Sequence, residues 1–554
     1  MARIWLAEMT VGKPDGSTTV LRVCSGRGYT TSPAASPANT EYDPRLKQPV
    51  NITRSISSPG ATIGQTKIAL GNVVVANPDG GLDGWMAYSF DGRLIEIYSG
   101  DEAAAYPAGF TKEFVGTMDY PDFSLTDVTI KLRETQREMD APIQILHYGG
   151  TNVLPAGLDG VAGDLKGKVI PLLYGRKRNF SPPCVNTSLL IYQISSEAVQ
   201  TVTAVYDQGA PLTAGAAYTD VTDMMTNAPT AGQYRFLNTA GGSYIRLGSS
   251  PVDPPTVDAE QNSSTPANET CAQIFSQLVT RAGANLGNSS RYSIAAGDVA
   301  AVDAVAPGVI QLYIDREMTF IEAFDAIAAT AGLWWGSNIA GKIRIKQLRA
   351  PSGTPVLSLT KNDVIPPLER LATKDENRGV PLYRVTCRYD QNPTVQTTNV
   401  ALSVSDARRA VIGQEWKEAT YTDTSVQSRY LLADALVIDT LYAEEADALT
   451  EAQRRQKMQA VQRHRFDVQV QHGPAFTALD LGDIIGLFHP RFSLNVEGSE
   501  EGQLFVLTGI APDAGERRIT LSLWGSSLEM QNRLFEDGVT RLFEDGTFRL
   551  TESS

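Results

Sequence analysis

The chain has 554 residues, of which 42% are hydrophobic and 20% charged, a composition typical of folded globular proteins that excludes disorder throughout. At about 100–200 residues per domain, this length predicts roughly three to five domains. The net charge is −14, from 48 Lys and Arg against 62 Asp and Glu, which excludes a protein that wraps nucleic acid through its phosphates.

The cysteines and the N-terminus indicate where the chain is made. The four cysteines form no CxxC pair, which argues against a zinc ribbon or a local iron–sulfur motif and predicts buried, reduced thiols; they are Cys24, Cys184, Cys271 and Cys387. Glu8 interrupts the N-terminus before a secretory signal can develop. No apolar run approaches the roughly 18 residues of a membrane span. We therefore expect synthesis in a cytoplasm and no transmembrane segment.

Residues 1–150 are predicted to form an N-terminal β domain without helices. β-branched or alternating runs are separated by turn formers such as Asp91-Gly92, and the runs are 19–24, 67–70, 73–76, 93–98 and 123–132. A second β-rich domain is predicted over residues 151–255, with strands at 167–175, 189–192, 201–206 and 244–247, and with a proline-rich linker at 249–255. In this second domain, Arg176, Lys177 and Arg178 are interpreted as a loop cluster, either solvated or touching a neighbouring subunit or passing DNA.

Residues 256–350 are predicted to form an α+β module. Thr265 and Pro266 are typical of a helix start, and apolar residues then recur on one face from 267 to 282, before Gly283. A second helix begins with a capping box, Thr319 and Glu322, and ends at Gly332. A hairpin over 333–335 and 342–348 follows.

Residues 351–528 are predicted to form a C-terminal β domain with one long helix at about 443–464. Acidic residues crowd the first half of that helix and basic residues the second half, which complements the helix dipole. The expected strands are 382–387, 400–404, 466–470, 483–487, 503–510 and 519–524.

Residues 529–554 contain an internal repeat. Residues 533–540, RLFEDGVT, are followed directly by 541–548, RLFEDGTF, and then by a truncated copy. The period of eight is even, so a strand keeps each Leu on one face, and each octad is predicted to be a short strand closed by a Glu-Asp-Gly turn. We interpret the repeats as a strip that docks a fibre or another partner, through Arg533, Leu534, Phe535, Arg541, Leu542, Phe543, Arg549 and Leu550.

The residues do not specify an enzyme. None of the histidines has a metal-ligand spacing or a GxSxG nucleophile beside it, and they are His147, His464, His472 and His489. Residues 163–168 lack the first glycine and the Ser or Thr of a phosphate loop, so a turn before a strand is favoured. Residues 79–83 lack the alternating acids of a calcium loop. We therefore expect no catalytic residue, no metal and no cofactor.

Three stretches together resemble the baseplate hub, or tail-tip, proteins of long-tailed bacteriophages. They are 167–175 with 189–193 and 205–207, then the helix and hairpin of 320–348, and finally the helix before Arg465 with 479–485, 506–510 and 519–525. The resemblance spans about residues 160–525. It implies a mainly β, multi-domain fold with two β-barrel-like hub domains and smaller α+β modules, followed here by the C-terminal octads.

The same resemblance implies a structural role in the virion tail tip. A trimeric hub of this family would adapt the sixfold tail tube to a threefold tip and anchor the central fibre. The expected partners are two more copies, distal tail ring and tail tube proteins, the central fibre or tip protein, and the tape-measure protein and transiting DNA in the lumen, without stable nucleic-acid binding. Two alternatives stay open: an envelope-directed carbohydrate-binding or lytic tail protein, and a hexameric distal tail ring protein.

Overall fold

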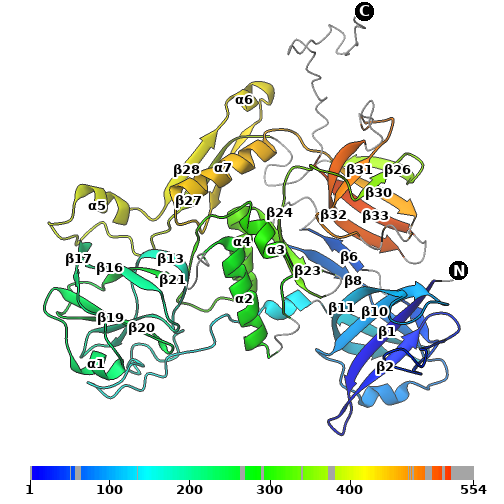
Figure 1. The fold of residues 1–554 in the computed structure, drawn as a ribbon, viewed down its shortest axis with the longest axis horizontal. Helices are drawn as coiled ribbons and strands as arrows, with labels where there is room; N and C mark the ends of the chain where they lie inside the picture. Colours follow the sequence, from blue (N-terminus) through cyan, green and yellow to red (C-terminus); the bar gives the residue numbers. More distant parts are fainter. Residues whose placement is uncertain are drawn as a thin grey trace, which may run out of the picture.

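The computed structural model describes residues 3–49, 52–56, 64–133, 135–261, 269–287, 292–338, 341–371, 381–471, 473, 476, 479–492, 494, 502–513 and 518–525. The fold is mainly β and multi-domain, as the sequence predicts. Figure 1 shows two barrel-like sheets on one side of the molecule, a β-sandwich on the other, and helices between them.

The N-terminal sheet is antiparallel and curls toward closure. Its strand order is β2-β1-β10-β11-β12-β9-β5, with β1 (Arg3–Gly12), β2 (Thr18–Cys24), β5 (Leu46–Gln48), β9 (Val73–Ala76), β10 (Leu94–Asp101), β11 (Phe110–Phe123) and β12 (Asp127–Arg133). A bridge between Val23 and Asp43 brings the two ends of the sheet together. Alternate side chains such as Met9, Ile95 and Ile97 fill the interior.

Short elements join these strands. Two small strands, β3 (Tyr29–Thr30) and β4 (Glu41–Tyr42), cover the outer face, and two 3-10 helices follow, η1 (Asp83–Ala87) and η2 (Thr135–Met139). The single strand expected at 123–132 is divided by a turn at 124–126, where Leu125 is exposed. The hairpin of β11 and β12 therefore takes the place of one longer strand.

Part of the N-terminal region leaves its own sheet. Strand β6 (Ile52–Ser55) pairs with β8 (Lys67–Leu70) and also with β32 (Gln503–Asp513) of the C-terminal sheet, where Ser55 faces Gly509 and Arg54 faces Ile510. Strand β7 (Gly64–Gln65) pairs in parallel with β23 (Leu333–Ser337). Figure 1 shows β6 and β8 lying between the two barrel-like sheets. The first and last parts of the chain are thus connected by main-chain hydrogen bonds.

Residues 172–261 and 311–314 build a sandwich of two five-stranded sheets. One has the order β17-β16-β21-β13-β22 and the other β14-β15-β20-β19-β18. The strands are β13 (Leu172–Phe180), β14 (Cys184–Asn186), β15 (Ile191–Ser195), β16 (Thr201–Asp207), β17 (Ala210–Pro211), β18 (Thr213–Ala214), β19 (Gln233–Thr239), β20 (Gly242–Leu247), β21 (Thr256–Gln261) and β22 (Gln311–Ile314). Phe180, Ile245 and Val257 lie in the core between the sheets.

Two expectations for this region are corrected. Residues 167–171 are a turn and coil, so β13 begins at Leu172 and runs on through Arg176, Lys177 and Arg178, which are not in a loop. A short helix, α1 (Val221–Thr226), precedes the proline-rich linker, capped by the side chain of Asp220. The six-residue helix is too short to show a full apolar period in the sequence.

The central module holds α2 (Cys271–Asn285), α3 (Asp298–Asp303), α4 (Phe320–Ala331), β23 and β24 (Ile343–Gln347). The expected start of α2 at Thr265 is wrong, because Thr270 is the N-cap and its side chain accepts from the Gln273 amide. Gly283 lies inside α2. The capping box of α4 and the left-handed Gly332 are confirmed. Phe275, Phe324 and Trp335 stack in the core.

We expect Thr319→Ala to lower the free energy of unfolding by about 1 kcal/mol, because the Glu322 amide at the start of α4 would lose its acceptor. Thr424→Ala is the matched control, since Thr424 is the N-cap of α6 (Ser425–Arg429) but its side chain makes no capping bond. Urea unfolding curves measure both. Equal losses in the two variants would contradict the capping role of Thr319.

A three-stranded sheet, β28-β27-β29, packs against the long helix α7 (Glu445–Gln459). The strands are β27 (Leu382–Tyr389), β28 (Lys417–Thr422) and β29 (Asp434–Asp439). Two short helices lie in the connections between these strands: α5 (Asp406–Ile412) follows β27, and α6 follows β28. Residues 400–404 are turns and not the expected strand, and Leu402 there is 99% exposed. These turns belong to an arm, residues 390–416, that reaches the sandwich (Figure 1).

The C-terminal sheet has the order β25-β31-β32-β33-β30-β26, with β6 added at β32. Its strands are β25 (Leu357–Leu359), β26 (Val364–Leu371), β30 (Arg465–Gln471), β31 (Ile484–Leu487), β32 and β33 (Arg518–Trp524). Phe466, Phe505 and Leu521 lie in its core. The strands expected at 466–470, 483–487, 503–510 and 519–524 are confirmed.

Candidate functional site

The residues predicted to dock a partner lie outside the described part of the chain. Arg533, Leu534, Phe535, Arg541, Leu542, Phe543, Arg549 and Leu550 all follow Gly525, the last residue described. Their role therefore stays a prediction. The described residues instead show the ion pairs and hydrogen bonds that connect the sandwich, the central module and the barrel-like sheets.

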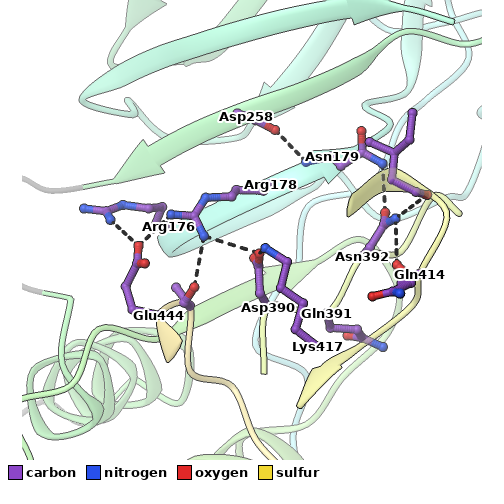
Figure 2. Close-up of polar contacts among 12 residues, drawn as sticks. Arg176, Arg178, Asn179, Asp258, Asp390, Gln391, Asn392, Gln414, Lys417 and Glu444 are labelled. Carbon is purple, nitrogen blue, oxygen red and sulfur yellow. Dashed lines mark hydrogen bonds and ion pairs between the residues drawn. The ribbon is translucent and has the colours of Figure 1, made fainter. Parts of the chain in front are cut away.

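The basic residues of β13 form a charged junction. Figure 2 shows Arg176 and Arg178 converging on Glu444, the N-cap residue of α7. An Nη atom of each guanidinium donates to Oε1 of Glu444, at 2.8 Å from Arg176 and 2.6 Å from Arg178. Arg178 also lies 3.4 Å from Asp390, which receives a 2.7 Å bond from Lys417. Carboxylates of the same chain neutralise the charges of Arg176 and Arg178. This cluster is therefore neither a solvated loop nor a surface for DNA.

The alternate residues of β13 point to the other face and hold the arm. Lys177 donates to the main-chain oxygen of Gln391 at 2.8 Å, and Asn179 donates to Asn392 Oδ1 at 2.8 Å (Figure 2). Burial lowers the pKa of Lys177 to about 8, against the opposing effect of Asp390. Asn179 has φ +50°, next to a register shift between β13 and β21. This irregularity turns its amide toward the arm.

The arm is held by further contacts along the sandwich. The Ala401 amide donates to the Gln208 oxygen at 3.0 Å, and the Arg408 guanidinium stacks 4.0 Å from the ring centre of Tyr206. Arg408 also donates to Asn179 at 3.2 Å. Polar and stacking contacts therefore fasten the sandwich to the β27–β29 unit at several separate points.

Two carboxyl groups, one buried and one half-buried, extend the junction. Arg176 lies 3.1 Å from Glu260 at the end of β21 and 3.9 Å from Glu269 just before α2. Glu269 is 2% exposed. Burial, and then the hydrogen bond to Glu260, raise the pKa of Glu269 to about 7. The two acids thus share one positive partner, and a proton on Glu269 relieves their repulsion.

A second charged junction connects the barrel-like sheets to the central module. Asp480 accepts from Arg54 of β6 at 2.9 Å and from Arg344 of β24 at 2.8 Å. Arg344 also pairs in a bidentate way with Asp298 at the start of α3, at 2.6 and 3.0 Å. The side chain of Arg54 is 8% exposed, so this contact is shielded from solvent. Both junctions connect parts that lie far apart in the sequence.

The histidines make separate contacts. His464 Nδ1 accepts from Arg370 at 2.6 Å, and His489 Nδ1 accepts from the Arg491 amide at 3.1 Å. His147 Nε2 lies 3.8 Å from the exposed carboxylate of Glu317. His472 is outside the described residues. The three described histidines lie in different parts of the fold, and each is partnered by neighbouring protein groups.

Residues 79–83 and 163–168 also have structural roles. Both carboxylate oxygens of Asp79 receive 2.7 Å bonds from Arg45, which hold its pKa below the usual range. Asp83 accepts from Asn77. Residues 162–167 form a turn, as predicted. Within the described ranges, no group of three or more His, Cys, Asp and Glu side chains is arranged to hold a metal ion.

The cysteines are thiols with raised pKa values. Burial raises the pKa of Cys24 to about 11 and that of Cys387 to about 12, and it also raises the pKa of Cys184 and Cys271. Thiolate chemistry is suppressed at all four positions. Among the helices of the described part, none is both long and apolar enough to cross a membrane.

Comparisons with known proteins give distant structural similarities. No protein family model matches the chain, and no curated protein matches it. The 43 kDa tail protein of prophage MuSo2 from Shewanella oneidensis is 10% identical, with TM-score 0.38, over 94% of this chain and 98% of that one. A tail protein from Neisseria meningitidis MC58 is 8% identical, with TM-score 0.39, over 95% and 97%.

A third solved structure, prophage tail protein gp18 from Listeria monocytogenes EGD-e, is 8% identical, with TM-score 0.36, over 95% of each chain. All three are tail proteins, the class that the sequence motifs resemble. At these TM-scores, the function of this chain has to be argued from its own residues.

Proposed function

We propose that this chain is a structural protein of a phage tail tip, and that three copies form the hub between the tail tube and the central fibre. The observation that supports this most is the pairing of β6 with β32. It brings a segment of the N-terminal region, between β5 and β9, into the C-terminal sheet and so ties the two barrel-like parts of one chain together. Three such chains would supply six barrels in a ring that matches a sixfold tube, while the assembly itself stays threefold.

The charged junctions support the same role. A hub transmits force between tube and fibre, and its parts have to keep fixed positions. Arg176, Arg178 and Glu444 fasten the sandwich to α7, and Asp480 fastens β6 to β24. The net charge of −14 suits a wall that DNA passes without being bound. The distal ring, tube and tape-measure proteins are the proposed partners on the tube side, and the virion tail tip is the proposed location.

The octads are the proposed attachment for the central fibre. We expect that deleting residues 531–554 leaves a trimer, near three times the chain mass of 59.8 kDa, but yields particles without the distal fibre. Light scattering of the purified protein measures the mass, and electron microscopy of particles measures the fibre. A stable hexamer would favour the distal ring alternative, and a folded monomer at micromolar concentration would contradict the hub. Particles of the deletion variant that keep the fibre would contradict the role of the octads.

A further inference from the structure

The outer edge of strand β29 is open and apolar. Among the described residues, β29 of the sheet β28-β27-β29 pairs with β27 on one side only. Before and within it, Leu431 is 90% exposed, Leu432 is 81% exposed and Val437 is 52% exposed. Adjacent exposed leucines beside an unpaired strand edge are unusual on a protein that stands alone. This edge is therefore suited to accept another strand.

The opposite edge of the same sheet is protected. Strand β28 begins with Lys417 and Glu418 and continues with threonines whose side chains face solvent. Charged side chains on an edge strand discourage further pairing. In β29 the charged residues Asp434 and Asp439 stand at the two ends, and the four residues between them, Ala435 to Ile438, are apolar. The β29 edge thus offers a longer apolar stretch than the β28 edge.

A strand beside β29 would meet apolar surface on both faces. Leu436 and Ile438 pack toward the core of the central module, whereas Val437 points to the outer face. Each octad offers Leu on one face and Phe on the other, because neighbouring residues of a strand alternate. The octad therefore fits this edge in its alternation of apolar side chains.

The described chain ends near the start of β29. Gly525 accepts from Arg463 at 2.6 Å, and Arg463 also donates to Met458 near the end of α7. Two residues before Met458, Gln456 donates to the Leu382 oxygen at 3.1 Å, and Leu382 lies opposite Asp434 in the sheet. The eight residues from 525 to 533 can span up to about 26–29 Å. The first octad is thus within reach of β29 of its own chain.

We propose that residues 533–540 add to the outer edge of β29 of the same chain as a further strand, which leaves the second octad to face the fibre or tip protein. The proposal rests on the proposed function only in the role of that second octad. Leu534 or Phe535 then lies beside Val437 on the exposed outer face of β29. The junction of α7 with β13 then fixes the direction in which the octads leave the hub.

Disulfide cross-linking tests the site. In the full-length chain, we expect Val437→Cys combined with Phe535→Cys, or with Leu534→Cys, to give a cross-link within one chain under mild oxidation, measured by mass spectrometry and non-reducing gels. Leu402→Cys is the matched control, since Leu402 is an exposed leucine on the arm. A link at 402 as strong as at 437, or links only between chains, would overturn the proposal.

Hydrogen exchange gives a second measurement without cysteines. We expect the amides of β29 to exchange at least tenfold faster after deletion of residues 531–554, with the amides of β28 unchanged. Equal exchange of β29 with and without the octads would overturn the proposal. The mass of the same samples is measured in parallel. If the protein is a trimer and the exchange of β29 does not change on deletion of the octads, this docking site is rejected but the proposed hub is not. If the protein is a folded monomer and β29 is cross-linked to the octad, the hub is rejected but this docking site is not.

Discussion

Arg455→Met is expected to lower the free energy of unfolding by about 3 kcal/mol, because it removes one of the two arginines that pair with the buried Glu451 carboxylate. Arg455 and Glu451 lie one turn apart on the inner face of α7, and both side chains are almost wholly buried. Arg455 donates to Oε1 of Glu451 at 2.6 Å and also to the main-chain oxygen of Ala329 near the end of α4. One guanidinium therefore serves both a buried charge and a helix terminus.

The carboxylate remains ionised because of its arginines. Burial alone would raise the pKa of Glu451, but Arg455 and Arg454 together hold it below the usual value. Lys457→Met on the exposed face of α7 is the control and is expected to change stability by less than about 0.5 kcal/mol. The double variant Glu451→Gln/Arg455→Met should recover part of the loss. Denaturant unfolding measures all three, and a loss below about 1 kcal/mol for Arg455→Met would contradict the buried pair.

Glu269→Gln is expected to remove much of the pH dependence of stability between pH 5 and 7. The folded pKa of Glu269, about 7, lies above its ordinary value of 4.5. The folded state therefore holds the proton more tightly, and this contribution is complete below pH 4.5 and is lost as the pH rises through 7. The native chain should lose about 2–3 kcal/mol over this interval through this one group.

The glutamine variant keeps the shape of the protonated acid but has no charge to gain. At pH 8 it should be at least as stable as the native chain, while at pH 5 the two should be similar. Thermal melts from pH 5 to 8 measure the difference. Glu418→Gln is the control, because Glu418 is an exposed residue of β28 and its replacement should leave the profile unchanged. A profile of Glu269→Gln parallel to that of the native chain would show that Glu269 stays ionised beside Glu260.

The elements that could be predicted from the sequence carry local signals. The box of Thr319 and Glu322 fixes the start of α4, and alternation in 466–470 and 519–524 fixes two strands of the C-terminal sheet. The sequence predicts the start of α2 five residues too early, because Thr265 and Pro266 are as good a helix signal as Thr270. Residues 400–404 have β-branched character, but the arm packs against the sandwich and not within a sheet. The β-propensity of the residues carries no information about that tertiary contact.

The charged junction could not be predicted from the sequence. The sequence places Arg176 and Arg178 in a loop, whereas the structure places both in β13. Their partner Glu444 is 268 residues away from Arg176, and no local pattern joins the two. Glu444 belongs to the acidic start of α7, but its contact with β13 is a property of the tertiary fold. The pairing of β6 with β32 of the C-terminal sheet could not be predicted from the sequence for the same reason.

The pairing of β6 with β32 has a consequence for biosynthesis. Arg54 and Asp480, which lie on either side of this contact, are 426 residues apart in the chain. At about 5–20 residues per second, a ribosome needs on the order of half a minute or more to make the second after the first. During that time β6 has no β32 to join, and Ile56 just after it, which packs in the core of the C-terminal sheet, has no such core to enter. Completion of the C-terminal sheet is therefore a late step, which requires that the chain has been made at least as far as β33.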